Sequence, residues 1–410
     1  MTVPASASGA TAPQPSAPSL REIAAHTTIT FLSTLAIQAT TFAILALAAL
    51  TLPIAEFARL SLIVASVMLA SALFEFGLNI TATKMYGDTR DEGYLRAAFA
   101  MRLLMVLVGV VAGVGMAFAG ATDVGTGIVL GSLLNVWNGM RATDQARQDY
   151  SSFTRSSVAF AVLRAGAGLI ALLMLADPLL IAIAIYGLPV AASVLSLSAR
   201  LALRAFARPW PPLRDALRYG GYVYVNAVTF IAIPYVPQFF IASRLDATAV
   251  GTYGLILTFV GPVSLLIYSL RSVLLPKMLG SPSAFESLLW SKRGLGLIGA
   301  FWAVMMAGGV AVAWGIGLAY GARFPQIETA FLIFFAGFSG TAAIGLYSLS
   351  VHTRGVPGLA AAIGLAKLIA LVPAVILFGT SLAGIVSAVA AIMVGFEVVL
   401  ALLLRGKACP

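Results

Sequence analysis

The sequence is short of charge. Charged residues make up 10% of its 410 positions, whereas 60% are hydrophobic, and the mean hydropathy is +0.99. A water-soluble domain has roughly a quarter of its residues charged. A chain with this composition cannot fold as a water-soluble globule, and a membrane protein is expected instead.

Cysteine and histidine are almost absent. The one cysteine, Cys409, stands at the very end of the chain, so neither a disulfide nor a thiol metal site is expected within one chain. The only histidines are His26 and His352, which lie near opposite ends. The sequence also contains no phosphate-binding glycine loop, metal-ligand cluster or nucleophile motif. We therefore expect no enzyme activity, no metal and no cofactor.

Basic residues outnumber acidic ones, with a formal net charge of +10. On a soluble protein this excess would suggest nucleic acid, but the sequence contains no nucleic-acid-binding motif. In a membrane protein, Lys and Arg collect in cytoplasmic loops and set the orientation. We expect the basic residues to play that part and nucleic acid not to be a partner.

Long apolar runs dominate the chain. A helix needs roughly 20 apolar residues to cross a bilayer. On this criterion we predict an all-α polytopic protein with twelve transmembrane helices. The expected spans are 24–51, 57–80, 95–119, 124–143, 153–175, 179–203, 218–243, 248–275, 293–320, 326–349, 357–378 and 381–404.

The distribution of Lys and Arg over the loops predicts the orientation. An even number of spans puts both termini on one side, and most of the basic loop residues fall on that side. Only Arg59, Arg244 and Arg323 fall on the other. Because basic loops stay in the cytoplasm, both termini are predicted to be cytoplasmic.

The chain divides into two halves of six spans. Residues 1–19 are rich in Pro, Ala and Ser and predict a disordered tail. Residues 20–203 form a predicted N-lobe, 204–217 a proline-containing linker, 218–404 a C-lobe and 405–410 a short tail. No segment between the spans is long enough to fold as a separate domain.

The two halves resemble each other in their order of charge and hydropathy. Each begins with a Leu-Arg pair, ending at Arg21 or Arg218, and continues through two apolar runs to a Lys-Met pair that begins at Lys84 or Lys277. The offset between the copies is nearly constant and close to half the chain. Such repeats are common in membrane transporters, whose substrate site lies between the repeats near the middle of the membrane.

Two basic residues, Arg164 and Lys367, lie near the middle of expected spans. A charged side chain at the bilayer centre costs roughly 2.5–3.5 kcal/mol on insertion scales, so it usually faces a cavity or a partner. We predict that both line a cationic cavity for an anionic substrate. The alternative is a structural ion pair or a side chain that reaches the interface.

Acidic residues are rarer inside the spans. Glu75 and Glu397 lie in the cytoplasmic thirds of two spans, and Arg271 lies near the cytoplasmic end of another. The repeat places Glu75 and Arg271 at matched depth in the two halves, which suggests a contact that closes the cytoplasmic side. The alternative is that each pairs within its own lobe. For Glu397, an orienting role near Arg405 and an ion-coupling role remain open.

Uncharged polar residues also occur within the apolar runs. Four amides, Asn135, Asn138, Asn226 and Gln238, are candidates for substrate binding, because amides together with aromatic faces suit sugar rings. The alternative is that the amides hydrogen-bond neighbouring helices.

Three short segments resemble a known family. Residues 75–84 (EFGLNITATK) resemble the "FGLN…T" stretch of bacterial polysaccharide flippases, and residues 250–254 (VGTYG) resemble their recurrent "VGxY". Residues 275–277 (LPK) also fit. These flippases are the O-antigen and exopolysaccharide exporters of the multidrug/oligosaccharidyl-lipid/polysaccharide (MOP) superfamily. The predicted twelve spans in two lobes extend the resemblance over essentially the whole chain.

The resemblance implies movement of polyprenyl-diphosphate-linked oligosaccharide across the bacterial cytoplasmic (inner) membrane for lipopolysaccharide or other surface polysaccharide. It implies membrane lipids as surroundings, and polymerase and glycosyltransferases of the same pathway as partners. Two alternatives remain: a cation-coupled drug or small-molecule exporter of the same superfamily, or a membrane-embedded polysaccharide polymerase. Drug-exporting relatives commonly carry an acidic residue in the first span, where this chain offers only Gln38.

Overall fold

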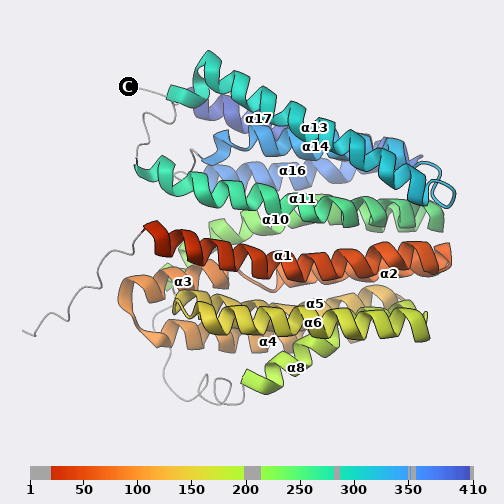
Figure 1. The fold of residues 1–410 in the computed structure, drawn as a ribbon, viewed down its shortest axis with the longest axis horizontal. Helices are drawn as coiled ribbons and strands as arrows, with labels where there is room; N and C mark the ends of the chain where they lie inside the picture. Colours follow the sequence, from red (N-terminus) through yellow and green to blue (C-terminus); the bar gives the residue numbers. More distant parts are fainter. Residues whose placement is uncertain (1–19, 198–213, 281–286, 350, 352–356, 407–410) are drawn as a thin grey trace, which may run out of the picture.

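The described part of the chain in the computed structural model comprises residues 20–197, 214–280, 287–349, 351 and 357–406 (Figure 1). The predicted N-terminal tail and most of the predicted linker lie outside it. The helices of the first half are α1 Leu20–Thr51, α2 Ile54–Leu73, α3 Leu78–Thr89, α4 Glu92–Phe118, α5 Thr122–Ala146, α6 Tyr150–Met174, α7 Pro178–Ala182, the π-helix η1 Ile183–Gly187 and α8 Leu188–Leu197. Those of the second half are α10 Arg214–Arg244, α11 Ala247–Gly280, α13 Lys292–Tyr320, α14 Ile327–Ile344, the 3₁₀-helix η2 Tyr347–Leu349, α16 Pro357–Phe378 and α17 Leu382–Gly406.

The helices confirm the predicted all-α polytopic membrane fold, with α2–α3 and α7–α8 each forming one broken span. In the described residues, ten helices are long and apolar enough to cross a membrane. The two remaining spans are α5 and the broken α7–α8. Helix α5 is less apolar because it packs against α2, α4 and α6 and buries polar groups such as Ser132 and Asn135 inside the lobe.

The second span differs from the continuous helix predicted over 57–80. Helix α2 ends at Leu73, and the chain resumes as α3 at Leu78. Phe76 and Gly77 have positive φ angles of 51° and 67°, which an α-helix does not allow. The Glu75 carboxylate accepts hydrogen bonds from the amides of Gly77 (3.2 Å) and Asn79 (2.9 Å), so it stabilises the break and the first turn of α3.

Several helices begin at a capping side chain in a loop. Asp91 accepts from the amide of Gly93 at the start of α4, and Ser291 accepts from Gly294 at the start of α13. Asp149 caps α6, and the hydrogen bond from the Ser152 amide lowers the pKa of this carboxyl group. These caps satisfy amides that have no partner within the helix, and they explain why the helices begin where the loops end.

The two halves form two lobes with matching internal contacts. In the N-lobe, α1 packs on α6, and both α2 and α4 pack on α5. In the C-lobe, the corresponding helices make the same contacts: α10 packs on α16, and both α11 and α13 pack on α14. The contacts between the lobes are also reciprocal, since α2 meets α10 and α1 meets α11. In Figure 1, α1, α2, α10 and α11 lie in the middle, with the remaining helices of each half outside them. This arrangement confirms two pseudo-symmetric six-span lobes.

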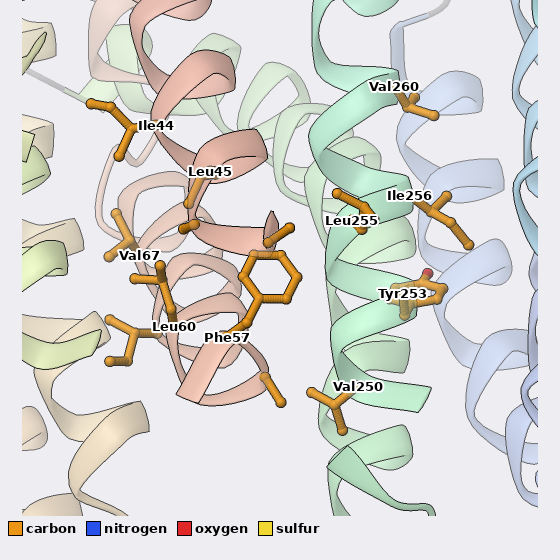
Figure 2. Packing of buried hydrophobic residues seen from close by; sticks show 14 of the residues in the cluster. Ile44, Leu45, Phe57, Leu60, Val67, Val250, Tyr253, Leu255, Ile256 and Val260 are labelled. Carbon is orange, nitrogen blue, oxygen red and sulfur yellow. The ribbon is translucent and has the colours of Figure 1, made fainter. Parts of the chain in front are cut away.

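Buried apolar side chains continue from one lobe into the other. One core cluster includes Phe57 and Val67 of α2 together with Val250 and Leu255 of α11. Figure 2 shows these side chains on the neighbouring helices of the two lobes. Phe57 is fully buried and makes an edge-on contact with Phe324, at 5.9 Å between ring centroids. We call the end of the bundle where both described chain ends lie the near end, and the end with the α1–α2 turn the far end (Figure 1).

Candidate functional site

A small cavity lies between the lobes, with a volume of about 60 Å³. This is room for a few water molecules. Its walls come from α1, α2, η1, α10 and α11, the elements at the lobe interface. The lining residues are Gln38, Thr41, Phe42, Leu45, Ser61, Val64, Met68, Tyr186, Tyr235, Gln238, Gly254, Leu257, Thr258, Gly261 and Pro262.

The lining is polar but neutral. Among the described residues that form it, none is acidic or basic, and amides and hydroxyls of Gln, Thr, Ser and Tyr alternate with apolar side chains. Gln238 is 1% exposed, and its Nε2 has no hydrogen-bond partner among the described residues. A buried donor without a partner is costly, so this amide is suited to bind a ligand or water in the cavity.

The cavity follows the internal repeat. Gln38 and Thr41 of α1 correspond to Tyr235 and Gln238 of α10 at the offset that relates Arg21 to Arg218. Ser61, Val64 and Met68 of α2 correspond in the same way to Gly254, Leu257 and Gly261 of α11, at the offset that relates Lys84 to Lys277. Equivalent faces of the two halves therefore meet at the cavity, as expected for a site between repeats.

Arg164 lies directly behind this lining. It is 4% exposed, and its guanidinium donates to the hydroxyl of Thr41 (Nη1, 2.6 Å) and to the carbonyl of Ile185 (Nε, 2.9 Å). Its Cζ lies 4.9 Å from the ring centroid of Tyr186 and 4.4 Å from that of Phe160. The wide turns of η1 present Ile185 and Tyr186 to it. Arg164 thus contacts two cavity residues without being one of the lining residues.

Lys367 lies elsewhere. Its Nζ forms an ion pair with Oε1 of Glu397, joining α16 to α17 inside the C-lobe, and the two side chains are 9% and 12% exposed. The second oxygen, Oε2 of Glu397, has no hydrogen-bond partner among the described residues. Lys367 is not among the lining residues of the cavity, and its position matches the structural ion pair that was the alternative from the sequence.

The four predicted amides have different surroundings. Gln238 lines the cavity, as described above. Asn135 is fully buried and donates to the carbonyl of Phe74 (2.7 Å), while Asn138 donates to Ser71 (3.4 Å). Both bonds join α5 to the second span within the N-lobe. Asn226 is exposed on α10 and does not line the cavity.

The predicted closing contact involves one described side chain. Glu75 binds backbone amides at the break in the second span, whereas the side chain of Arg271 lies outside the described residues. Close by, Tyr224 of α10 stacks on Phe76 (5.1 Å between centroids) and donates to the carbonyl of Leu73 (2.8 Å). The break therefore touches the other lobe through aromatic and backbone groups.

The gate hypothesis for Glu75 and Arg271 stays a prediction with a direct test. If opposite charges at matched depth hold the near end closed, Glu75→Arg and Arg271→Glu should each reduce transport, and the double variant should recover it. Transport by membrane vesicles is the measurement. Losses that simply add in the double variant would contradict the contact and leave Glu75 as a cap of α3.

Sequence reasoning missed most of the lining. Ser61, Tyr186 and Thr258 are isolated polar residues in apolar runs, and Thr41 follows another threonine; in such runs Ser and Thr often bond only to the preceding turn. The repeat carried a usable signal for one pair of helices, because the first offset aligns Gln38 and Thr41 of α1 with the polar residues Tyr235 and Gln238 of α10. The second offset gives no such match, since Ser61 of α2 aligns with Gly254 of α11.

Comparison with known proteins shows which solved structures share this fold. No protein-family model and no curated protein matches the sequence. The structure is similar to the inward-facing conformation of a multidrug resistance MATE family transporter of the MOP superfamily, with a TM-score of 0.64, 14% identity, and coverage of 93% of this chain and 96% of that one. The outward-facing conformation of such a transporter gives 0.59 at 12% identity, covering 93% and 95%.

A third similar structure is a MOP superfamily transporter from Pyrococcus furiosus, for which a reverse polarity of the binding pocket suggests a different function. Its TM-score is 0.61 at 13% identity, and the match covers 93% of this chain and 95% of that one. These similarities extend over nearly the whole chain. The protein therefore has the fold of MOP superfamily transporters of the MATE type.

Proposed function

We propose that the protein is an alternating-access flippase that exports polyprenyl-diphosphate-linked oligosaccharide across the bacterial cytoplasmic membrane. The observation that carries the proposal is the neutral, hydrogen-bonding lining of the cavity between the lobes. Amides and hydroxyls pair with sugar hydroxyls, and Tyr186 and Tyr235 offer aromatic faces. Polymerase and glycosyltransferases would act on the same glycan on either side of this step.

Arg164 contributes positive charge from behind the lining. Its guanidinium binds Thr41 and lies beside Tyr186, so its field reaches the cavity through these two groups. A positive potential there favours an anionic diphosphate linker over a cation. An inside-negative membrane potential also favours outward movement of an anion, by roughly 2.3 kcal/mol per charge per 100 mV.

The size of the cavity supports a mechanism in which the two lobes move relative to each other. A volume of about 60 Å³ is too small for even one sugar ring, so the lobes have to separate to admit a glycan. Contacts between the lobes occur at the far end, through Phe57 and Phe324, and near the break in the second span, through Phe76 and Tyr224. We assign this closed arrangement to an occluded state between near-end and far-end opening.

We further propose that the near end is cytoplasmic. The described basic residues Arg90, Arg147 and Lys292 lie at that end, where α3 and α5 end and α13 begins, and basic loops are retained in the cytoplasm. We expect a C-terminal fusion to a reporter that is active only in the cytoplasm to give signal, and a fusion at the α1–α2 turn to give none. The reverse pattern of signals would contradict this orientation.

A second candidate function is drug export, which the likeness to a multidrug resistance MATE transporter favours. Recognition of a cationic drug would need an acidic or strongly electronegative lining. The neutral lining with Arg164 behind it argues for the glycan lipid instead.

An assay of lipid flipping in proteoliposomes distinguishes export of the glycan lipid from drug export. The full chain is reconstituted with a polyprenyl-diphosphate-linked oligosaccharide, and an impermeant glycan-cleaving enzyme reports the fraction exposed outside. We expect protein-dependent exposure of the inner pool, and no uptake of a fluorescent lipophilic cation by the same vesicles under a proton or sodium gradient. Cation uptake without glycan exposure would overturn the proposal in favour of drug export.

A further inference from the structure

One arginine connects the two lobes at the far end. Arg323 follows α13 in the C-lobe, and its guanidinium donates to the carbonyls of Ala49 (2.7 Å), Leu50 and Leu52 in the N-lobe. These carbonyls lie at the end of α1, where the helix leaves its last carbonyls without partners. Pro53 has no N–H, so Ala49 also lacks the usual donor four residues on.

Two neighbours of Arg323 strengthen this connection. The Tyr320 hydroxyl donates to the carbonyl of Ala46, one turn earlier on α1 (3.2 Å). Phe324 is fully buried and contacts Phe57 of α2 across the interface, with Gly251 of α11 packed against both rings. Hydrogen bonds and buried aromatic area thus coincide on one short segment, residues 320–324.

The other two far-end arginines behave differently. Arg59 binds Glu56 and Asp123 (3.0 Å each), both in the N-lobe. Arg244 donates to the carbonyl of Ile376 (3.3 Å), in the C-lobe. Of these three, Arg323 alone bonds across the lobe interface, and its acceptors are backbone groups at a negative helix end, where a cation is stabilised.

We infer that residues 320–324 form a far-end latch, in which Arg323 holds the carboxyl end of α1 and so keeps the far side of the cavity shut. Separation of the lobes at the far end has to break its bonds to the α1 carbonyls, whereas separation at the near end leaves them intact. The latch would therefore set the balance between the two open states. This inference rests on the proposed alternating access but not on the identity of the cargo.

The test measures lobe separation directly. In a Cys409→Ser background, spin labels are placed at Ala119→Cys in the N-lobe and Thr380→Cys in the C-lobe, two exposed far-end positions outside the latch and its acceptors. Distances are measured by pulsed electron resonance on the full chain in lipid nanodiscs. We expect Arg323→Ala to raise the ratio of separated to closed far ends by about tenfold, because charge-assisted hydrogen bonds are lost.

Three variants complete the experiment. Arg323→Lys keeps the charge but not the planar guanidinium, so a smaller shift in the same direction is expected. Tyr320→Phe removes one hydrogen bond and should also shift the distances weakly. Arg59→Ala is the matched control and should leave the distances unchanged, since its partners lie within one lobe.

Unchanged distances in Arg323→Ala would overturn the latch, and so would an equal shift in Arg59→Ala. Because no substrate is present, either result leaves the cargo proposal untouched.

Discussion

Replacement of Lys367 alone by methionine is expected to destabilise the protein by about 3–5 kcal/mol, because it leaves a buried carboxylate without its partner. Glu397 is 12% exposed, and its second oxygen already lacks a hydrogen bond among the described residues. No other described side chain is therefore positioned to compensate the loss of Lys367. The measurement is unfolding in mixed micelles of increasing denaturing-detergent content.

The double variant Lys367→Met with Glu397→Leu separates a structural pair from a cationic binding group. Replacing both partners removes the buried charge, so most of the lost stability should return. Lys292→Met is the control, since Lys292 is exposed at the start of α13 and its loss should change stability by less than about 0.5 kcal/mol. If the single variant is as stable as the unmodified chain, the pair is not buried as described.

Transport by the double variant gives a second result. If the Lys367–Glu397 pair only joins α16 to α17, transport should return together with stability. If stability returns and transport does not, one of the two groups acts on the substrate or on a coupling ion. The two roles that the sequence leaves open for Glu397 are thereby distinguished.

The second large effect is expected at Arg164. Arg164→Met should reduce transport at least tenfold, since the hydroxyl of Thr41 and the ring of Tyr186 lose the group that positions them at the cavity. It should also cost about 1.5–3 kcal/mol of stability, because the Ile185 carbonyl loses a charged donor. Arg164→Lys is expected to restore little, since an ammonium cannot bond both partners while stacking on two rings.

Arg155→Met is the matched control for Arg164. Arg155 lies on the same helix, α6, but is exposed, and its hydrogen bonds within the described part of the chain go to Ser151 one turn earlier on that helix. Its replacement should leave both transport and stability unchanged. Glycan-lipid flipping and detergent unfolding are measured on the same preparations. Full flipping by Arg164→Met at normal expression would remove Arg164 from the site.

The sequence by itself determined the class of the protein. Its apolar runs predict the spans, because hydrophobic length is what a bilayer selects and is independent of packing. The repeat of Arg21 and Lys84 in Arg218 and Lys277 predicts two lobes, because charges at helix ends are set by local position relative to the membrane. The confirmed features all rest on such local properties.

Only the tertiary structure decided which polar groups meet. Arg164 and Lys367 have the same signature in sequence, a cation in the middle of an apolar run. Yet Arg164 lies behind the cavity, bonded to Thr41, while Lys367 is paired with Glu397 within the C-lobe. A charge in a membrane needs a partner or water, and hydropathy does not say which, because the partner comes from another helix far along the chain.

The same reason applies to the break in the second span and to the far end. Residues 57–80 are apolar enough to predict one helix, but Glu75 and Gly77 end it by hydrogen bonding and backbone geometry. From the sequence, Arg323 is recognisable only as one of the three basic residues predicted on the side opposite the termini. Its bonds to the end of α1 exist because the fold brings the α13–α14 turn beside the α1–α2 turn, a proximity set by packing of the lobes and not by any local pattern.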